Sequence, residues 1–271
     1  MITHDIHIHT HLSDCAKRDA FMEGYIAEAR NIGLKTLGFS DHSWDSNVEG
    51  ASNWYKPQTF KRLESRREEI KSLNTDGLKI LLGAEGEFAN FLLGISEDAK
   101  NYVDYIIVPH SHTHMKGFVM PSEYAGDAQK HANFLVNSFI ALCNHEKRSL
   151  FFGIAHPMWP VGASLEYITE IFDNISDEEL AACAKAAKEA NIALELNISS
   201  IQTVPESIGS DFCMRRFFDA CKKEGCQFFL GSDAHSIPAL TNYHAKQEYV
   251  ISIMGLDESD FKSAEELILN M

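Results

Sequence analysis

Short apolar runs that end in metal-ligand residues recur along this chain of 271 residues. The first run carries Asp5, His7 and His9 at alternate positions, and a strand sends alternate side chains to one face. Two imidazoles on that face can converge on one divalent ion, and we expect Asp5 to orient one of them from behind. Later runs end in Asp41-His42, in Glu85, in His110 with His112 and His114, in His156, and in Asp233 with His235. This repetition predicts a site for more than one metal ion.

Strands and helices are expected to alternate along the chain, which favours parallel strands with covering helices. The strands are expected over 2–9, 35–40, 78–85, 103–109, 150–155, 192–198 and 227–231. The helices are expected over 19–32, 57–73, 122–147, 176–190, 211–224, 238–254 and 258–270. Two long loops, 43–57 and 113–127, either cover the site or lie on the surface without a role.

Polar residues at the C-terminal ends of seven strands are typical of a barrel whose active site is built by the strand-to-helix loops. An open doubly wound sheet is the alternative. Ligand residues follow the first strand, the last strand and most of those between, and only closure brings these ends together. We therefore predict an α/β fold with a closed or nearly closed barrel, as a single domain over residues 1–271.

The composition argues against several classes of function. A formal net charge of −15 disfavours nucleic acid as the main partner, because binding a phosphate backbone needs clustered Lys and Arg. No stretch approaches the roughly 18 uncharged apolar residues that cross a bilayer, and no basic and apolar leader precedes the first strand. The six cysteines show no paired spacing, so we expect reduced thiols and a cytoplasmic protein. A small anionic substrate is compatible with this charge.

Three residues after the first strand are further candidates for the site. Cys15 is expected to pack, with thiolate ligation of a metal as the alternative. Lys17 and Arg18 are candidates to clamp a phosphate group, with solvated charges at a helix start as the alternative. Farther along, Glu195 and Asn197 share one face of the sixth strand, where they either hydrogen-bond ligand histidines or fill the barrel.

These motifs resemble the polymerase and histidinol phosphatase (PHP) superfamily of metal-dependent phosphoesterases, and the resemblance spans nearly the whole chain. The motifs that carry it are Asp5-Ile-His7-Ile-His9-Thr10, Ser40-Asp41-His42, Gly83-Ala84-Glu85, the histidines of 110–114, Ile154-Ala155-His156-Pro157, the segment 194–200 and Leu230-Gly231-Ser232-Asp233-Ala234-His235. The resemblance implies a distorted, TIM-like (β/α)7 barrel. It also implies two or three divalent ions, commonly zinc, manganese or iron, at the C-terminal ends of the strands.

The resemblance further implies roles for individual residues. The implied ligands are His7, His9 and Asp233 for a first ion, His156 with His112 or else His110 for a second, His42 and His235 for a third, and Glu85 as the bridge. His114 would lie behind the ligands. The family usually supplies another ligand to the third ion shortly after the first-strand histidines, often a histidine, whereas this chain has Ser13-Asp14-Cys15. Asp14 is either a substitute ligand or a solvent-facing carboxylate.

Divalent ions lower the pKa of coordinated water from about 15.7 towards about 7, so hydrolysis on such a site requires no protein nucleophile. The catalytic set is therefore Glu85 and Asp233 as ligands and His235 as the group that protonates the leaving alkoxide, with the histidines of 110–114 as alternatives to His235.

Three kinds of function fit these residues. The first is hydrolysis of a small phosphate monoester, with L-histidinol phosphate of histidine biosynthesis as the leading substrate by family analogy. The second is another hydrolase, either a phosphodiesterase or exonuclease acting on nucleotides, or a C–N hydrolase of the amidohydrolase type. Amidohydrolases commonly bridge their metals with a lysine, whereas Glu85 takes that position here. The third is metal binding without catalysis, which does not explain mixed carboxylate and imidazole ligands at a barrel mouth.

Overall fold

The computed structural model of this protein describes residues 1–263, 266 and 268, and its central element is a seven-stranded parallel sheet. The strands run in sequence order as β1 (His4–Ile8), β2 (Thr36–His42), β3 (Lys79–Glu85), β6 (Tyr105–Pro109), β7 (Gly153–Ala155), β8 (Ala193–Asn197) and β9 (Phe228–Gly231). A small antiparallel hairpin of β4 (Phe88–Ala89) and β5 (Leu92–Leu93) lies between β3 and β6 in the sequence. All seven expected strands are confirmed, and the hairpin was not predicted.

The sheet curls into a nearly closed barrel, because its first and last strands meet at their C-terminal ends. The backbone N–H of Asp233 donates to the carbonyl of His7 at 2.7 Å, and the N–H of His9 donates to the carbonyl of Ala234 at 2.9 Å. Ile8 and Ala234 form a parallel bridge at the same place. An open doubly wound sheet would keep its two edge strands apart, so the barrel prediction is confirmed.

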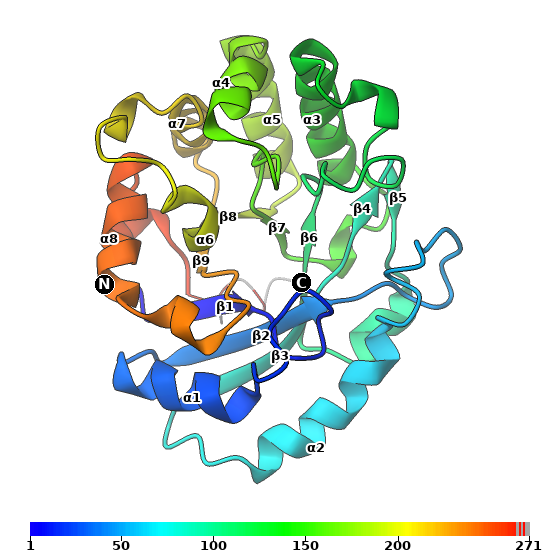
Figure 1. Cartoon of the computed structure of the whole chain (residues 1–271), viewed down its shortest axis with the longest axis vertical. Coiled ribbons are helices and arrows are strands. Elements are labelled where there is room, and N and C mark those ends of the chain that lie inside the picture. Colours follow the sequence, from blue (N-terminus) through cyan, green and yellow to red (C-terminus); the bar gives the residue numbers. More distant parts are fainter. Residues whose placement is uncertain (264–265, 267, 269–271) are drawn as a thin grey trace.

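Helices surround the barrel (Figure 1). They are α1 (Met22–Asn31), α2 (Glu64–Ser72), α3 (Ala128–Cys143), α4 (Leu165–Asp173), α5 (Asp177–Glu189), α6 (Ile198–Ile201), α7 (Arg215–Glu224) and α8 (Tyr243–Ile253). In the described part of the chain, no helix is long and apolar enough to cross a membrane. The helix expected over 258–270 falls partly outside the described residues, and its described part begins with the 3-10 turn Glu258–Asp260.

Helix α4 was not predicted from the sequence, although its start and its apolar face are both encoded locally. The Ser164 hydroxyl accepts a hydrogen bond from the backbone N–H of Tyr167, which satisfies one free amide of the first turn. Ile168, Ile171 and Phe172 then fall on one buried face at helical spacing. This helix lies between β7 and α5 in the sequence and packs against α3 outside the barrel.

A small apolar cluster fills the barrel interior below the mouth. Its members are Ile6, Leu81, Tyr105, Ile107, Phe152, Ala155, Ala193 and Phe229. The Tyr105 hydroxyl crosses the interior and donates to the carbonyl of Ile6 at 2.7 Å. Gly38 and Gly83 make room for this ring, because a Cβ atom at either position would collide with it. The interior is therefore closed by packing, and the polar residues gather at the C-terminal mouth.

The first strand departs from simple alternation. The pairing register of β1 with β2 shifts between Asp5 and Ile8, which is the mark of a bulge or irregularity. Ile6 packs inside the barrel, and the next residue, His7, also reaches the site at the mouth. The prediction that alternation alone places Asp5, His7 and His9 on one face was therefore wrong for this strand, even though both histidines converge.

Candidate metal centre

Histidines and carboxylates from the C-terminal ends of six strands converge at the barrel mouth. Their ligand atoms form three groups, namely His7-His9-Glu85, Glu85-His112-His156 and His9-His42-His235, and inside each group these atoms lie within 4.8 Å of one another. Because Glu85 and His9 each belong to two groups, the three groups form one continuous cluster. Asp233 joins it, since its Oδ1 lies 3.5 Å from Nε2 of His7 and 3.2 Å from Nε2 of His9.

Five of these imidazoles form a hydrogen bond through Nδ1 to a neighbouring group. Their Nε2 atoms are therefore the nitrogens that face the cluster. The Nδ1 partners are Glu195 Oε1 for His7 (2.7 Å), Ser13 Oγ for His9 (3.0 Å), Glu87 Oε2 for His112 (2.7 Å), Ser111 Oγ for His156 (2.8 Å) and the Asp233 carbonyl for His235 (2.9 Å). An Nδ1–H that donates outward fixes the tautomer whose Nε2 carries a lone pair. His42 is the exception, because it presents Nδ1 to the cluster.

Glu195 on β8 connects two of the ligand positions. Its Oε1 accepts from Nδ1 of His7, and its Oε2 accepts the backbone N–H of His156 at 2.6 Å. The side-chain amide of Asn197 donates to the same Oε2 at 3.0 Å. Glu195 therefore takes the first of the two roles expected for this pair, which is a hydrogen bond to a candidate ligand histidine. Asn197 forms no hydrogen bond to such a histidine among the described residues and instead supports the Glu195 carboxylate.

Asp5 was predicted to orient a first-strand histidine, and this prediction was wrong. Asp5 Oδ1 accepts the backbone N–H groups of Ser232 at 2.9 Å and of His7 at 3.3 Å, and so ties β1 to the chain after β9. Among the described residues, the Asp5 side chain forms no hydrogen bond to an imidazole nitrogen. Glu195 orients His7 instead. The long sequence separation between Glu195 and His7 hides this pairing from local pattern analysis.

Glu87 is a functional candidate that the sequence analysis missed. Its Oε2 lies 2.7 Å from Nδ1 of His112 and also accepts the Tyr55 hydroxyl at 2.8 Å. Glu87 follows Glu85 by two residues and is fully buried. The sequence did contain a signal for this residue, because Glu87 is a second acid only two positions after the expected bridging residue Glu85.

Ser13 and Asp41 form a second missed support. The Ser13 hydroxyl donates to Asp41 Oδ1 at 2.7 Å and receives the Nδ1–H of His9. Asp41 also accepts the backbone N–H of Thr10 at 2.8 Å and its hydroxyl at 2.7 Å. The end of β2 therefore holds the loop that follows the first-strand histidines. In the described part of the chain, Asp41 forms no hydrogen bond to His9 directly but positions it through the Ser13 hydroxyl.

Two residues of the cluster adopt left-handed backbone conformations. The φ angle is 29° at His156 and 55° at Asp233, values that non-glycine residues rarely adopt. Each is held by a backbone hydrogen bond, from His156 to Glu195 and from Asp233 to the His7 carbonyl at 2.7 Å. Strain of this kind is concentrated at functional sites, where the surrounding contacts over-determine the geometry.

The buried carboxylates of the cluster are ionised. Burial opposes the charge of Glu85, but the imidazoles of His42 and His7 outweigh burial and hold its pKa well below the usual range. Burial likewise opposes the charge of Asp233, and its pKa is lowered chiefly by His7. In return, Glu195 and Asp233 overcome the burial of His7 and raise its pKa well above the usual value. Protons therefore balance this negative charge until a divalent ion replaces them.

The donor atoms fit divalent cations. Nδ1 of His42 and Oε2 of Glu85 lie 2.8 Å apart, yet the contact lacks hydrogen-bond geometry, and neither atom has a hydrogen-bond partner among the described residues. A buried polar atom without a hydrogen-bond partner costs free energy, so such atoms are typical of places where a protein holds an ion or a water molecule. Imidazole nitrogens with carboxylate oxygens are the ligands preferred by zinc, manganese and iron. We therefore treat the cluster as a candidate metal centre.

His110 lies outside this centre. Its Nδ1 is 2.9 Å from the Ser138 hydroxyl, and its Nε2 accepts the backbone N–H of Met158 at 3.1 Å, so both ring nitrogens are engaged. Burial lowers the pKa of His110 to about 3, which keeps the ring neutral in this structural role. Because β6 ends at Pro109, alternation no longer places His110 and His112 on one side. The alternative in which His110 replaces His112 is therefore not supported.

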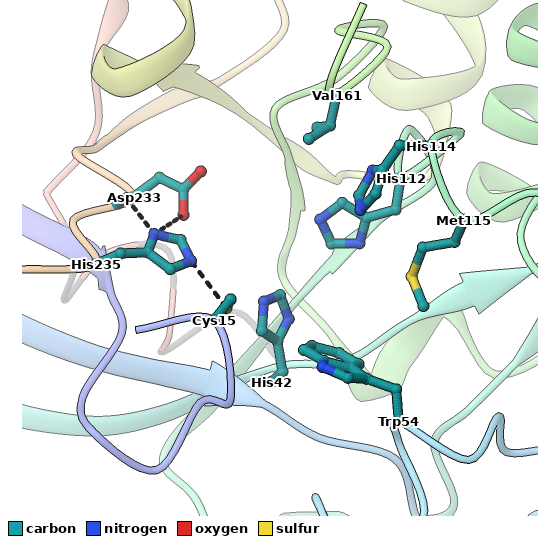
Figure 2. A pocket seen from close by; sticks show the side chains of 9 residues that line it. All are labelled: Cys15, His42, Trp54, His112, His114, Met115, Val161, Asp233 and His235. Atoms are coloured by element: carbon teal, nitrogen blue, oxygen red, sulfur yellow. Dashed lines mark hydrogen bonds and ion pairs between the residues drawn. The ribbon is translucent and has the colours of Figure 1, made fainter. Parts of the chain in front are cut away.

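A cavity of about 520 Å³ opens above the cluster (Figure 2). Its lining residues are Cys15, His42, Trp54, His112, His114, Met115, Val161, Asp233 and His235. Trp54 comes from the loop 43–57, and His114 and Met115 come from the loop 113–127. Both long loops thus build the pocket wall, and His114 faces the cavity instead of lying behind the ligands.

The segment after β1 contributes one residue to this pocket. Lys17 and Arg18 are exposed and are not among the lining residues, so the structure gives no support to a phosphate clamp there. Asp14 is exposed and also absent from the lining. Cys15 does line the pocket, with Sγ 3.1 Å from Nε2 of His235, so the packing role expected for it was wrong. Burial, with nearby carboxylates, raises the pKa of Cys15 to about 12, so this thiol is protonated unless a cation is near.

A nearly closed barrel with imidazoles and carboxylates clustered at its mouth defines the class of metal-binding α/β-barrel proteins. Within that class, residues 5–199 match the model of the PHP domain, and the chain belongs to this family. The chain is 25% identical to a probable phosphatase of Clostridium botulinum over 268 residues, which cover 98% of this chain and 89% of the relative. It is 26% identical over 252 residues to a probable phosphatase of Clostridium acetobutylicum, covering 92% and 85%.

The fold is similar to that of the histidinol phosphate phosphatase of Lactococcus lactis. The TM-score is 0.61 at 18% identity, over 94% of each chain. That crystal structure holds zinc, L-histidinol and phosphate. The likeness supports the distorted, TIM-like barrel predicted from the sequence.

Proposed function

We propose that this protein is a metal-dependent phosphoesterase that hydrolyses a phosphate monoester of a small alcohol, with L-histidinol phosphate as the leading candidate. The geometry of Glu85 carries the proposal. Its Oε2 lies 2.8 Å from Nδ1 of His42, and its Oε1 lies 3.1 Å from Nε2 of His156, so the two oxygens face different ligand groups. A carboxylate in this position is suited to bridge two cations.

The residues that would hold the ions follow from the three ligand groups. His7 and His9 with Asp233 would hold one ion, His112 and His156 a second, and His42 and His235 a third, with Glu85 between them. When bound, divalent ions supply an activated water and neutralise charge on the phosphate oxygens. Zinc, manganese and iron all suit these ligands, and two ions are the minimum that the bridge requires.

The chain itself supplies position and proton transfer. Glu195, Glu87, Ser13 and Ser111 hold the imidazoles so that inward nitrogens keep their lone pairs. His235 lines the pocket and is only partly buried, so we assign it the transfer of a proton to the leaving alkoxide when the third ion does not occupy its Nε2. His114, which is exposed and also lines the pocket, is the alternative group for this step.

The pocket supports a small phosphorylated substrate. Among the described residues, no Lys or Arg lines it, so bound cations must balance the phosphate charge. Trp54, Met115 and Val161 offer an apolar surface on which the carbon skeleton of the alcohol can pack. A volume of about 520 Å³ matches a compound of the size of L-histidinol phosphate and is small for a polynucleotide.

The alternatives are a phosphodiesterase or exonuclease and a C–N hydrolase of the amidohydrolase type. The net charge of −15 disfavours a nucleic-acid partner, and a glutamate in the bridging position disfavours the amidohydrolase. All six cysteines are free, which supports a reducing compartment and hence action in the cytoplasm.

The experiment compares three substrates. The purified full chain is stripped with a chelator, reloaded with Mn²⁺ or Zn²⁺, and assayed against p-nitrophenyl phosphate, bis(p-nitrophenyl) phosphate and L-histidinol phosphate. We expect both monoesters to be hydrolysed faster than the bis ester, with the highest kcat/KM for L-histidinol phosphate. Preference for the bis ester would overturn the monoesterase proposal, and loaded protein inert on all three would overturn a phosphoesterase function.

A further inference from the structure

Cys15 occupies an unusual position for a free thiol. It lies in the loop between β1 and α1, lines the pocket, and places Sγ 3.1 Å from Nε2 of His235 (Figure 2). Four of the other cysteines are buried, and Cys213 is partly buried with its Sγ near the Thr169 hydroxyl. Among the described residues, Cys15 is the cysteine that lines this pocket.

An independent observation points to a cation beside this thiol. His9, His42 and His235 bring their ligand nitrogens within 4.8 Å of one another. The His42 side chain is 7% exposed, and its Nδ1 has no hydrogen-bond partner among the described residues. Nδ1 of His235 is held by the Asp233 carbonyl, which leaves Nε2 directed at Cys15. The thiol thus lies beside His235 and lines the same pocket as His42, and these are the two imidazoles assigned to the third ion.

We propose that Cys15 supplies a thiolate ligand to the third cation, the one that His42 and His235 would hold beside Glu85. The inference rests on the metal centre of the proposed function and adds a residue to it. On binding, the S–H bond of Cys15 breaks, its proton passes to solvent, and a sulfur–metal bond forms without any change of oxidation state. Two imidazole nitrogens, one carboxylate oxygen of Glu85 and one thiolate make a four-ligand set of the size that zinc adopts in proteins.

The thiolate has a consequence for metal choice. Soft sulfur ligands favour Zn²⁺ and Co²⁺ over Mn²⁺, which prefers oxygen ligands. The site containing Cys15 should therefore select zinc or cobalt, whereas the sites around Glu85 accept manganese as well. A bound ion should also shield this thiol from alkylating reagents, which otherwise reach it because it lines an accessible pocket.

The competing interpretation is a hydrogen bond from a permanent thiol to His235, with no metal at sulfur. Both interpretations account for a distance of 3.1 Å, but they differ in spectrum. A Co²⁺–thiolate bond gives an intense charge-transfer absorption in the near ultraviolet, whereas imidazole and carboxylate ligands do not.

The first experiment titrates the metal-stripped full chain with Co²⁺ alone. We expect the charge-transfer band in the wild type and in Cys213→Ser, which is the matched control. Cys15→Ser should lose the band, and Cys15→His should lose it while still binding as many cobalt ions as the wild type. A band that persists in Cys15→Ser, or that is absent from the wild type, would overturn the proposal.

A second measurement needs no variant and so does not depend on how one folds. The wild-type protein is alkylated with iodoacetamide with and without Zn²⁺, and labelling of Cys15 and Cys213 is followed by peptide mass spectrometry. Zinc should slow labelling of Cys15 at least about tenfold and leave that of Cys213 unchanged, and equal labelling with and without zinc would contradict ligation. Cobalt or zinc binding at Cys15 in a protein that hydrolyses no phosphate ester would leave this inference standing and overturn the proposed function.

Discussion

Oε1 of Glu195 lies 2.7 Å from Nδ1 of His7, and the same carboxylate accepts the backbone N–H of His156. One buried acid on β8 therefore fixes a ligand from β1 and another after β7. Gly231 on β9 leaves room for it, since a Cβ atom there would collide with the carboxylate and with His7. The positions of three strands around the mouth thus depend on this contact.

Glu195→Gln should weaken metal binding while the fold is kept. An amide can no longer balance a positive charge on His7 and can present its NH2 group to Nδ1, which disturbs the tautomer that the inward Nε2 requires. We expect a loss of about 10- to 100-fold in zinc affinity, measured by competition with a chromophoric chelator. Glu189→Gln, on the exposed face of α5, is the control and should bind zinc as the wild type does. Equal affinities in the two variants would contradict the role of Glu195.

His112 and His110 should respond differently to substitution. His112→Asn should remove one bound ion and most of the activity, because His112 belongs to a ligand group. His110→Asn should keep its ions but lower the free energy of unfolding by about 1–3 kcal/mol, since Ser138 and the Met158 amide lose their partner. Metal analysis and denaturant unfolding of both variants separate these roles. Loss of an ion in His110→Asn alone would reverse the assignment.

Trp54 should contribute to binding of the leaving group. It lines the pocket with Met115 and Val161, so Trp54→Ala should raise KM for p-nitrophenyl phosphate about tenfold, or about 1.4 kcal/mol, through lost packing. Methyl phosphate offers no ring, and its KM should change little. Phe91→Ala removes an exposed aromatic outside the pocket lining and serves as the control. A similar effect of Trp54→Ala on both substrates would argue against this contact.

Metal affinity should rise with pH above neutrality. Burial lowers the pKa of His112, but Glu87 outweighs it and raises that pKa to about 9, so the stripped protein carries a proton there at pH 7.5. Zinc must displace this proton, and affinity should increase by about tenfold per pH unit for each proton released until the pH passes the raised pKa. Calorimetry in buffers of different ionisation enthalpy measures the release. Zinc affinity that stays flat between about pH 6.5 and pH 8.5 would contradict it.

The barrel and the gathering of His, Asp and Glu residues at its mouth could be predicted because both are encoded locally. Each strand is a short apolar run, and the candidate ligands lie at or close to the C-terminal ends of these runs, as in Ile154-Ala155-His156. Periodicity of this kind depends on neighbouring residues alone, so it survives without any knowledge of the tertiary fold. The same local signal was present for α4, where the Ser164 cap and the spacing of its apolar residues were overlooked.

The supporting contacts could not be predicted, because they join segments far apart in the chain. Glu195 and His7 are 188 positions apart, and no local pattern pairs them. The bulge in β1 also overrides the alternation that assigned the orienting role to Asp5. Where the chain leaves a strand, as after Pro109, side-chain direction depends on packing, which is why the choice between His110 and His112 stayed open until the structure was known.

The central claim is that cations held around Glu85 carry out phosphate ester hydrolysis, and the most direct measurement is hydrolysis of p-nitrophenyl phosphate before and after metal removal. Chelator-stripped wild-type protein should be inactive and should regain activity with Zn²⁺ or Mn²⁺. Glu85→Gln, folded but binding one ion fewer, should stay inactive under both conditions, because a neutral amide cannot bridge two cations. Undiminished hydrolysis by the stripped protein, or normal turnover in Glu85→Gln, would contradict the claim.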